Sequence, residues 1–225
     1  INNTDMEHQY CLVVLYKNLS LKNQALLKTL LSKRNFVIQF INVSQYIGNY
    51  SFYVGGKNNQ SYITNETYFR LLAPQLLPEY KKALYLDCDV VVQKGWDEIF
   101  DINLDGMMIA GVRDIWGNWE CYKRSSDLVK YRNNTLMLDN PLDYFNAGVL
   151  LINLERFRNT FSEKELLNIA VAQQWRKHDQ DVLNMVCKGR VKFLEYKWNL
   201  IECPSKNALK LTPLKEQVKY ERSIS

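Results

Sequence analysis

Short apolar runs alternate with longer amphipathic stretches along most of the chain. The first two apolar runs span residues 9–16 (QYCLVVLY) and 36–43 (FVIQFINV). Between them, Ser20 can cap a helix that continues to about Arg34 and carries leucines at helical spacing on one face. Because β-branched runs that alternate with helical patterns are typical of βαβ units, this order predicts an α/β domain with a mainly parallel central sheet.

Four later apolar runs predict the remaining core strands, at residues 83–86, 106–112, 147–152 and 191–194. The segment 116–141 is polar and aromatic with weak periodicity, and it predicts an excursion from the sheet. A helix that begins at Thr64 or Asn65 should be broken or kinked by Pro74, because proline lacks the N–H that a helix interior uses.

Two further helices are predicted by their starting residues. Ser162 and Glu165 have the spacing of a capping box, in which each side chain bonds the other residue's backbone N–H. The helix that follows should run to about Gln174. A shorter helix is predicted from Asp179 to Cys187, where Gly189 ends it.

Composition and charge exclude several classes of protein. With 225 residues and 47% hydrophobic content, the chain suits one globular domain. A net charge of +5 is too small to predict a partner among nucleic acids. No apolar run is long enough to span a membrane. The five cysteines are scattered, with no C-x-x-C pair, which disfavours zinc and disulfides.

These features predict a cytoplasmic protein, because scattered cysteines without a disulfide framework favour a reducing compartment. The last twenty residues are rich in lysine and arginine. Such a tail would allow peripheral contact with an anionic membrane at its inner face, although a solvated tail is the simpler interpretation.

The strongest local signal is the pair Asp87 and Asp89, which follows a predicted strand in the run LYLDCDVV. Carboxylates two residues apart point to one side, and ligands bind at the carboxyl ends of strands in open α/β sheets. Oxygen ligands of this kind suit Mn²⁺ or Mg²⁺, with open positions left for substrate phosphates. In the alternative interpretation, one Asp caps the next segment and the other is solvated.

The same run also resembles the nucleophile motif of haloacid-dehalogenase-like phosphatases, in which Asp87 would be the nucleophile. In that family the motif lies on an early core strand and a later acidic pair follows. Here two strand–helix units precede Asp87, and no clear acidic pair follows. The phosphatase remains open as an alternative enzyme.

Two more segments carry candidate polar groups. Asn146, in the run YFNAGVLLIN, can donate and accept hydrogen bonds at once, which suits a sugar hydroxyl; it could equally be a turn residue before Gly148. The run HDQD at 178–181 places acidic residues in a first helical turn, where they suit the helix dipole. It could also grip a polyhydroxylated ligand.

The order of these segments resembles glycosyltransferase family 8, which includes glycogenins and lipopolysaccharide glucosyl- and galactosyltransferases. The matching runs are LDCDVVV, GVRDIW, YFNAGVLLINLERFR, HDQDVLN and KWN, within about residues 62–199. The resemblance implies a GT-A fold with a Rossmann-like nucleotide-binding domain. It also implies transfer of glucose or galactose from a UDP-sugar, with retention of anomeric configuration, to a glycan or lipopolysaccharide-type glycolipid.

The resemblance assigns roles to individual residues. Asp87 and Asp89 would hold Mn²⁺, or Mg²⁺, against the UDP diphosphate. Positions that match the family's substrate-binding residues are Arg70, Asp114, Asn146, Ala147, Gly148, Asp179 and Gln180. Gln180, which matches the residue nearest the anomeric carbon, and Asp179 are the candidate catalytic residues.

Two departures from the family pattern stand out. The family's first strand should precede Asn2, and its third metal ligand, a histidine in a glycine- and lysine-containing segment, has no match after Trp198. We therefore expect residues 1–225 to form a single GT-A domain that lacks both pieces and has little activity alone. A non-catalytic sugar-nucleotide-binding relative is the alternative from the binding class. The candidate acceptor wall consists of Trp116, Trp119, Tyr122 and Tyr131.

Overall fold

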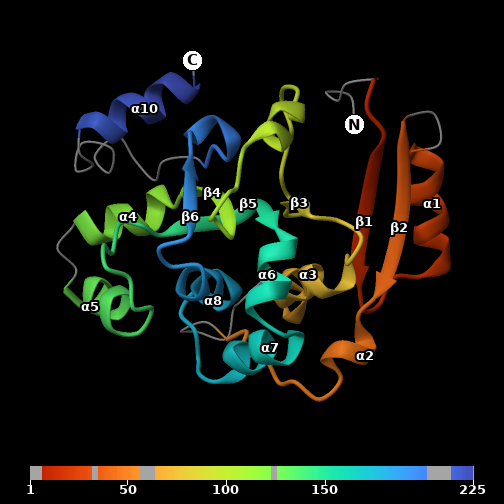
Figure 1. Cartoon of the computed structure of the whole chain (residues 1–225), viewed down its shortest axis with the longest axis horizontal. Helices are drawn as coiled ribbons and strands as arrows, with labels where there is room; N and C mark the ends of the chain where they lie inside the picture. The colour runs from red at the N-terminus through yellow and green to blue at the C-terminus, as the bar shows by residue number, and fades with distance from the viewer. Residues whose placement is uncertain (1–6, 32–34, 56–63, 123–125, 202–213, 225) are drawn as a thin grey trace.

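The computed structural model describes residues 7–31, 35–55, 64–122, 126–201 and 214–224, and its strands form two sheets (Figure 1). The smaller sheet pairs β1 (Tyr10–Tyr16) with β2 (Phe36–Asn42) in parallel. The central sheet has the order β3-β5-β4-β6. Its strands are β3 (Lys82–Leu86), β4 (Ile109–Arg113), β5 (Phe145–Asn153) and β6 (Val191–Leu194).

The central sheet is mixed, which corrects the expectation of a mainly parallel one. β5 runs antiparallel to both β3 and β4, and within the central sheet only β4 and β6 pair in parallel. A strand buried on both faces has the same continuous apolar pattern in either direction, so the run 147–152 does not reveal its orientation. The reversal places the beginning of β5 beside the end of β3.

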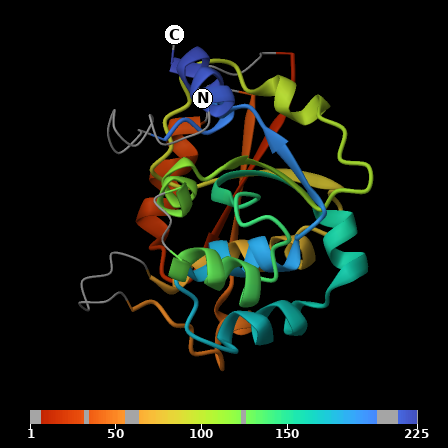
Figure 2. The ribbon, with the colours of Figure 1, turned by 90° about the vertical axis from the view of Figure 1, so that its left-hand side faces the viewer.

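Helices cover both faces of the central sheet. In Figures 1 and 2 a lower layer contains α3 (Ala73–Leu76), α6 (Leu154–Thr160), α7 (Glu163–Val171) and α8 (His178–Val186). The core lies between this layer and β5, where Phe145 and Leu150 are fully buried. On the other side, α10 (Leu214–Ile224) packs on the 3₁₀ helix η3 (Tyr196–Trp198).

Local signals place several helices correctly. α7 begins at the capping box, where Ser162 Oγ accepts from the Glu165 N–H and the Glu165 carboxylate accepts from the Ser162 N–H. The helical segment that begins at Asn65 does change just before Pro74, as predicted: the 3₁₀ helix η1 (Asn65–Leu72) ends there. Pro74 itself lies in the first turn of α3, where the missing N–H costs nothing.

The excursion 116–141 contains two helices that its weak periodicity did not reveal, α4 (Ile115–Tyr122) and α5 (Ser126–Asn134). The remaining short helices that the sequence did not predict are α2 (Ser44–Ile47) and the 3₁₀ helix η2 (Asp97–Asp101).

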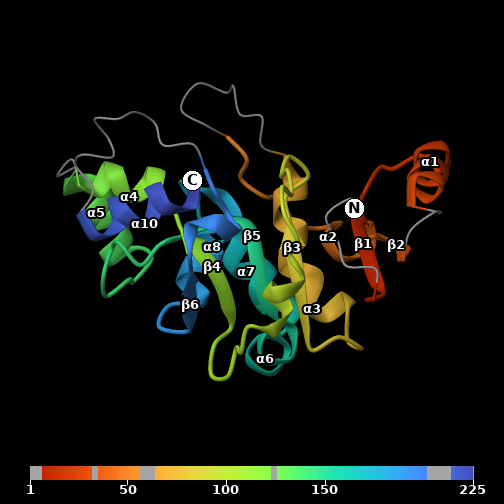
Figure 3. The same ribbon diagram turned by 90° about the horizontal axis from the view of Figure 1, so that it is seen from above.

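The unit β1–α1–β2 stands apart from the central sheet when seen from above (Figure 3). Its helix α1 (Leu21–Leu31) begins after Ser20 as predicted, but the leucine stripe is only partly covered: Leu31 is buried, whereas Leu26 and Leu30 are 58% and 63% exposed. No residue of β1 or β2 is fully buried. Contact with the rest of the fold includes a hydrogen bond from the Tyr10 hydroxyl to Asp97.

None of the helices in the described part of the chain is both long and apolar enough to cross a membrane. The described cysteines 11, 88, 121 and 187 are free thiols, whereas Cys203 lies outside the described residues. The predictions of a cytoplasmic location and of contact with a membrane face stay predictions.

Candidate active site

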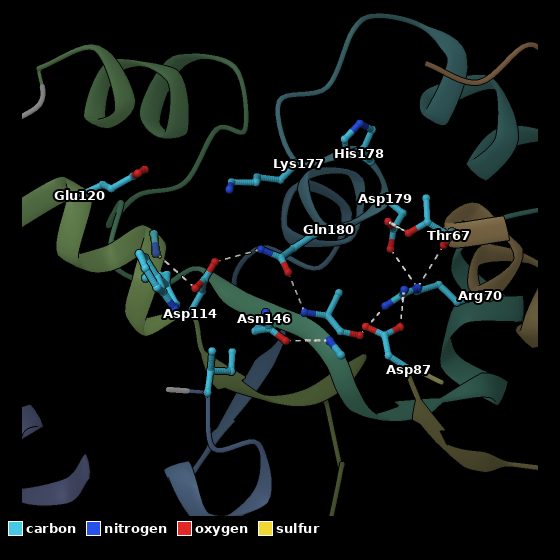
Figure 4. A pocket seen from close by; sticks show the side chains of 15 residues that line it. Thr67, Arg70, Asp87, Asp114, Glu120, Asn146, Lys177, His178, Asp179 and Gln180 are labelled. Atoms are coloured by element: carbon cyan, nitrogen blue, oxygen red, sulfur yellow. Dashed lines mark hydrogen bonds and ion pairs between the residues drawn. The ribbon is translucent and has the colours of Figure 1, made fainter. Parts of the chain in front are cut away.

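A pocket of about 460 Å³ opens where the end of β3 meets the beginning of β5 (Figure 4). The antiparallel pairing creates this junction, since the Asp87 N–H donates to the Gly148 carbonyl at 2.8 Å. The start of α8 and one face of η1 complete the pocket. The predicted site residues that line it are Arg70, Asp87, Asp114, Asn146, Ala147, Gly148, Asp179 and Gln180. Asp89 lines an adjoining cleft instead.

Arg70 is the central cation of the pocket, although it is only 6% exposed. Its Nε lies 2.9 Å from Asp179 Oδ2, and its Nη2 lies 2.7 Å from Asp87 Oδ1. Its Nη1 donates to the carbonyl of Ala147. The guanidinium also stacks on the ring of Tyr85, 4.2 Å from the ring centre. One planar side chain thus connects η1 to the end of β3, to β5 and to α8, because the guanidinium presents several N–H donors in a fixed geometry.

Asp179 is a buried carboxyl with a hydrogen bond from Thr67 to one oxygen and an ion pair with Arg70 at the other. Burial raises its pKa to about 6, while the Arg70 guanidinium and the Thr67 hydroxyl, which donates to Oδ1, act in the opposite direction. At pH 7 the group is therefore mostly a carboxylate and can accept hydrogen bonds from a ligand. Thr67 was not predicted, because its only sequence signal is its position three residues before Arg70.

Gln180 is held by hydrogen bonds at both ends of its amide. Its Oε1 accepts from the Ala147 N–H at 2.9 Å, and its Nε2 donates to Asp114 Oδ2 at 3.0 Å. Asp114 is 5% exposed, and its other oxygen accepts from the Gly117 N–H. The amide therefore lies between β5 and the carboxylate that follows β4.

Asn146 accepts two hydrogen bonds through Oδ1, from the Gly148 N–H and from Asn199 Nδ2, each at 2.8 Å. Within the described residues, no protein acceptor is recorded for its own Nδ2. Asn146 can therefore donate to a ligand in the pocket. Asn199, the last residue of the KWN run, positions Asn146, a role that its sequence did not suggest.

Asp87 and Asp89 are the residues that could hold a metal. Asp87 Oδ1 is engaged by Arg70 and by the Tyr85 hydroxyl, at 2.7 and 2.8 Å. Its Oδ2 has no recorded protein donor in the described chain, and the side chain is 34% exposed. Asp89 is exposed, and both residues line the adjoining cleft of about 1220 Å³.

This pair fits a hard cation that takes one or two carboxylates and leaves its other positions to substrate phosphates. A cluster of three or more acidic, histidine or cysteine side chains is not found among the residues described. Among the residues described, the candidate ligands for such a cation are Asp87 and Asp89.

The end of the pocket away from Asp87 carries one acidic and one basic side chain. Glu120 and Lys177 lie there, beyond Asp114 and Gln180 (Figure 4). Trp116, which is 43% exposed, also lines the pocket. The other residues of the predicted acceptor wall do not line the pocket. Trp119 packs edge-on against Trp116, Tyr122 lines another cavity and Tyr131 bonds Asp181.

The Gly148 position is crowded by site residues, which allows a prediction. A Cβ at Gly148 would lie 3.0 Å from Asn146 Oδ1 and 3.2 Å from Asp87 Oδ2. Gly148→Ala should therefore displace both side chains and lower kcat for a reaction in this pocket by about tenfold or more. The control is Gly111→Ala, whose Cβ would lie 3.0 Å from Leu150 in the core.

Both glycine variants should lose about 1–3 kcal/mol of stability from overpacking. Thermal unfolding and steady-state kinetics, measured well below both transitions, separate the two effects. Equal kcat values for the two variants would contradict the prediction that a side chain at Gly148 displaces Asn146 and Asp87.

The chain is similar to known glycosyltransferases in sequence and in fold. The family described as "Glycosyl transferase family 8" matches residues 1–219. A putative glycosyltransferase of Haemophilus influenzae is 32% identical over 142 residues, which cover 61% of this chain and 40% of the relative. Lipopolysaccharide 1,2-glucosyltransferase of Escherichia coli K12 is 30% identical over 139 residues, covering 60% of this chain and 38% of that protein.

The fold is also similar to that of a solved bifunctional glycosyltransferase, WbbM. The TM-score is 0.83 at 25% identity, over 99% of this chain and 40% of the other. The GT-A fold predicted from the sequence is thereby confirmed. The chain spans about 40% of the length of the two curated relatives. The family match excludes the phosphatase alternative, and the chain belongs to glycosyltransferase family 8.

Proposed function

We propose that the chain transfers a hexose, glucose or galactose, from a UDP-sugar to a hydroxyl of a glycan or lipopolysaccharide-type glycolipid, with retention. The observation that carries this proposal is that one pocket contains both the carboxylate Asp87 and the polar groups that could bind a sugar (Figure 4). Arg70 links the carboxylate Asp87 to Asp179, and Asn146 and Gln180 lie next to them. A site for a phosphate-bound metal thus adjoins a site for sugar hydroxyls.

The hexose would lie against Asp179, Asn146 and Asp114. The two carboxylates accept hydrogen bonds from hydroxyls, and the free Nδ2 of Asn146 donates one. Ala147 and Gly148 would contact the sugar through the backbone of β5, since both line the pocket. The resemblance to the family supports the UDP moiety and the hexose, and the name of the Escherichia coli relative supports the glycan class.

Asp87 and Asp89 would hold Mn²⁺ or Mg²⁺, which when bound would stabilise negative charge on the departing UDP. The uncommitted Oδ2 of Asp87 and the exposed Asp89 support this assignment. Arg70 cannot replace such a cation, because its guanidinium is already shared between Asp87 and Asp179.

Gln180 is better suited to stabilising the anomeric centre than to attacking it. An amide is a weak nucleophile, and its Oε1 already accepts a hydrogen bond from the Ala147 N–H. Retention would then follow from attack on the face from which UDP departs. The bond from C1 to the phosphate oxygen breaks, the bond from C1 to the acceptor oxygen forms, and the acceptor proton passes to the departing phosphate.

The acceptor sugar would occupy the end of the pocket that contains Trp116, Glu120 and Lys177. An exposed tryptophan offers an apolar face with a polar edge, and the two charged groups can bind hydroxyls on either side. The acceptor would therefore be a saccharide or the saccharide part of a glycolipid.

The test is turnover of UDP-glucose and UDP-galactose by the full-length protein. We expect UDP release that requires Mn²⁺ or Mg²⁺, stops with EDTA and accelerates with a saccharide acceptor; NMR of the product should show the donor's anomeric configuration. Binding of the sugar nucleotide without turnover would instead identify a non-catalytic binder. Absence of both binding and turnover would refute the proposal.

A further inference from the structure

The side-chain amide of Gln180 has only one orientation that satisfies its neighbours. Oε1 faces a donor, the Ala147 N–H, whereas Nε2 faces two acceptors, Asp114 Oδ2 at 3.0 Å and the Tyr144 Oη at 3.2 Å. Turning the amide over would place donor against donor at Ala147 and acceptor against acceptor at Asp114. The two acceptors therefore help to fix which atom of Gln180 points where.

Tyr144 can be an acceptor for Gln180 only because its own proton is committed elsewhere. Its hydroxyl donates to Asp181 Oδ1 at 2.6 Å. A phenol has a single proton, so its oxygen then meets Gln180 Nε2 as an acceptor. Tyr144 is 1% exposed, and burial together with Asp181 holds its pKa well above the ordinary value, so the phenol keeps its proton.

Asp181 lies behind the pocket and does not line it. It is 1% exposed, and its Oδ2 accepts from the Tyr131 hydroxyl at 2.7 Å and from the Lys177 N–H at 2.8 Å. Every recorded partner is a donor, so Asp181 acts as a pure acceptor. Its role as an acceptor thereby sets the direction of the hydrogen bond from Tyr144.

We propose that Tyr144 is a positioning residue for Gln180. Because the Tyr144 hydroxyl donates its proton to Asp181, its oxygen accepts from Gln180 Nε2 and so helps to fix the orientation of the Gln180 amide. This inference rests on the proposed function, in which Gln180 stabilises the anomeric centre. Tyr144 does not touch the substrate, because it is buried behind the pocket and acts through the Gln180 amide.

Tyr131 supplies a matched control. Tyr144→Phe and Tyr131→Phe each remove one hydroxyl bond to Asp181, but only Tyr144→Phe removes an acceptor from Gln180. We expect Tyr144→Phe to lower kcat about tenfold with the donor KM nearly unchanged, as for a hydrogen bond that matters in the transition state. Tyr131→Phe should keep kcat within about twofold.

A double-mutant cycle tests whether the effect passes through Gln180. In a Gln180→Ala background, Tyr144→Phe should cause little further loss of kcat, because the group that it positions is already absent. The same fold-loss in both backgrounds, or equal kcat values for the two phenylalanine variants, would overturn the proposal.

A second measurement does not depend on turnover. The ¹⁵N-labelled side-chain NH₂ of Gln180, assigned by its disappearance in Gln180→Glu, should shift and exchange faster with water in Tyr144→Phe and not in Tyr131→Phe. An unchanged signal in Tyr144→Phe would overturn the positioning role. If this response occurs in a protein without any UDP-sugar turnover, the proposed function fails while the positioning of Gln180 by Tyr144 stands.

Discussion

Replacing Arg70 with methionine should lower the free energy of unfolding by about 3–5 kcal/mol, the cost of removing one partner from a buried ion pair. Arg70 is 6% exposed, and Asp179 is 4% exposed. Without the guanidinium, Asp179 loses the cation that lowers its pKa, so its pKa should rise above the present value of about 6. The carboxyl would then be protonated at neutral pH and would offer a donor where the proposed contact with a sugar hydroxyl needs an acceptor.

The measurement is chemical denaturation of Arg70→Met beside a matched variant, Arg176→Met. Arg176 pairs with Asp127 at 2.9 Å, but their side chains are 44% and 79% exposed. An exposed pair contributes less than about 1 kcal/mol, so this control should unfold nearly as the unaltered protein does. Equal unfolding midpoints for the two variants would contradict the central role of Arg70.

Arg70→Lys separates charge from geometry. A lysine ammonium keeps the charge but lacks the planar fork that reaches Asp87, Asp179 and the Ala147 carbonyl at the same time. We expect stability between that of the unaltered protein and that of Arg70→Met. Transferase activity should remain far below normal, because either Asp87 or Asp179 would lose its contact.

The positions of the strands follow from the sequence, whereas their directions do not. Each predicted apolar run of the central sheet overlaps an observed strand, because burial demands continuous apolar segments. The antiparallel direction of β5 depends on how the chain returns through α4 and α5, which is a tertiary property. The contact of Gly148 with Asp87 arises from that direction, so composition and periodicity could not predict it.

The two helices in segment 116–141 escaped prediction because their buried positions include glycine and polar side chains as well as apolar ones. Gly117 and Asn118 are buried in α4, and the buried guanidinium of Arg132 from α5 lies against them. A Cβ at Gly117 would lie 2.3 Å from Arg132 Nη2, so glycine is required for the approach. A helix that buries glycine, amide and arginine does not show the apolar stripe on which sequence patterns depend.

Motif resemblance located most of the candidate site, and the supporting residues could not have been found in the same way. Three supporting residues each form a hydrogen bond with a predicted site residue that is distant in sequence. The pairs are Thr67 with Asp179, Tyr144 with Gln180, and Asn199 with Asn146. Their roles depend on which donor and acceptor atoms meet in the folded protein, and the spacing of residues along the sequence does not determine this. Tyr144 stood inside a motif in which the sequence assigned roles to Asn146, Ala147 and Gly148 but not to the tyrosine.

Replacing either of the two carboxylates proposed to hold the metal with asparagine should lower transferase kcat by at least about a hundredfold, since charge stabilisation by a metal is worth several kcal/mol. Asp89→Asn is the cleaner variant, because Asp89 is exposed and has no recorded contact with the described protein. Its thermal stability should not change. Asp87→Asn should also lose stability, because an amide cannot accept as well from both Arg70 and the Tyr85 hydroxyl.

Kinetics over a range of Mn²⁺ concentrations distinguish lost metal affinity from misfolding. If Asp89 is a ligand, Asp89→Asn should need more Mn²⁺ for half-maximal activity while unfolding at the normal temperature. Asp101→Asn is the matched control, because Asp101 is also exposed but lies outside both the pocket and the cleft. Full activity of Asp89→Asn at low Mn²⁺ would remove Asp89 from the metal site and leave Asp87 as the only carboxylate proposed to hold the cation.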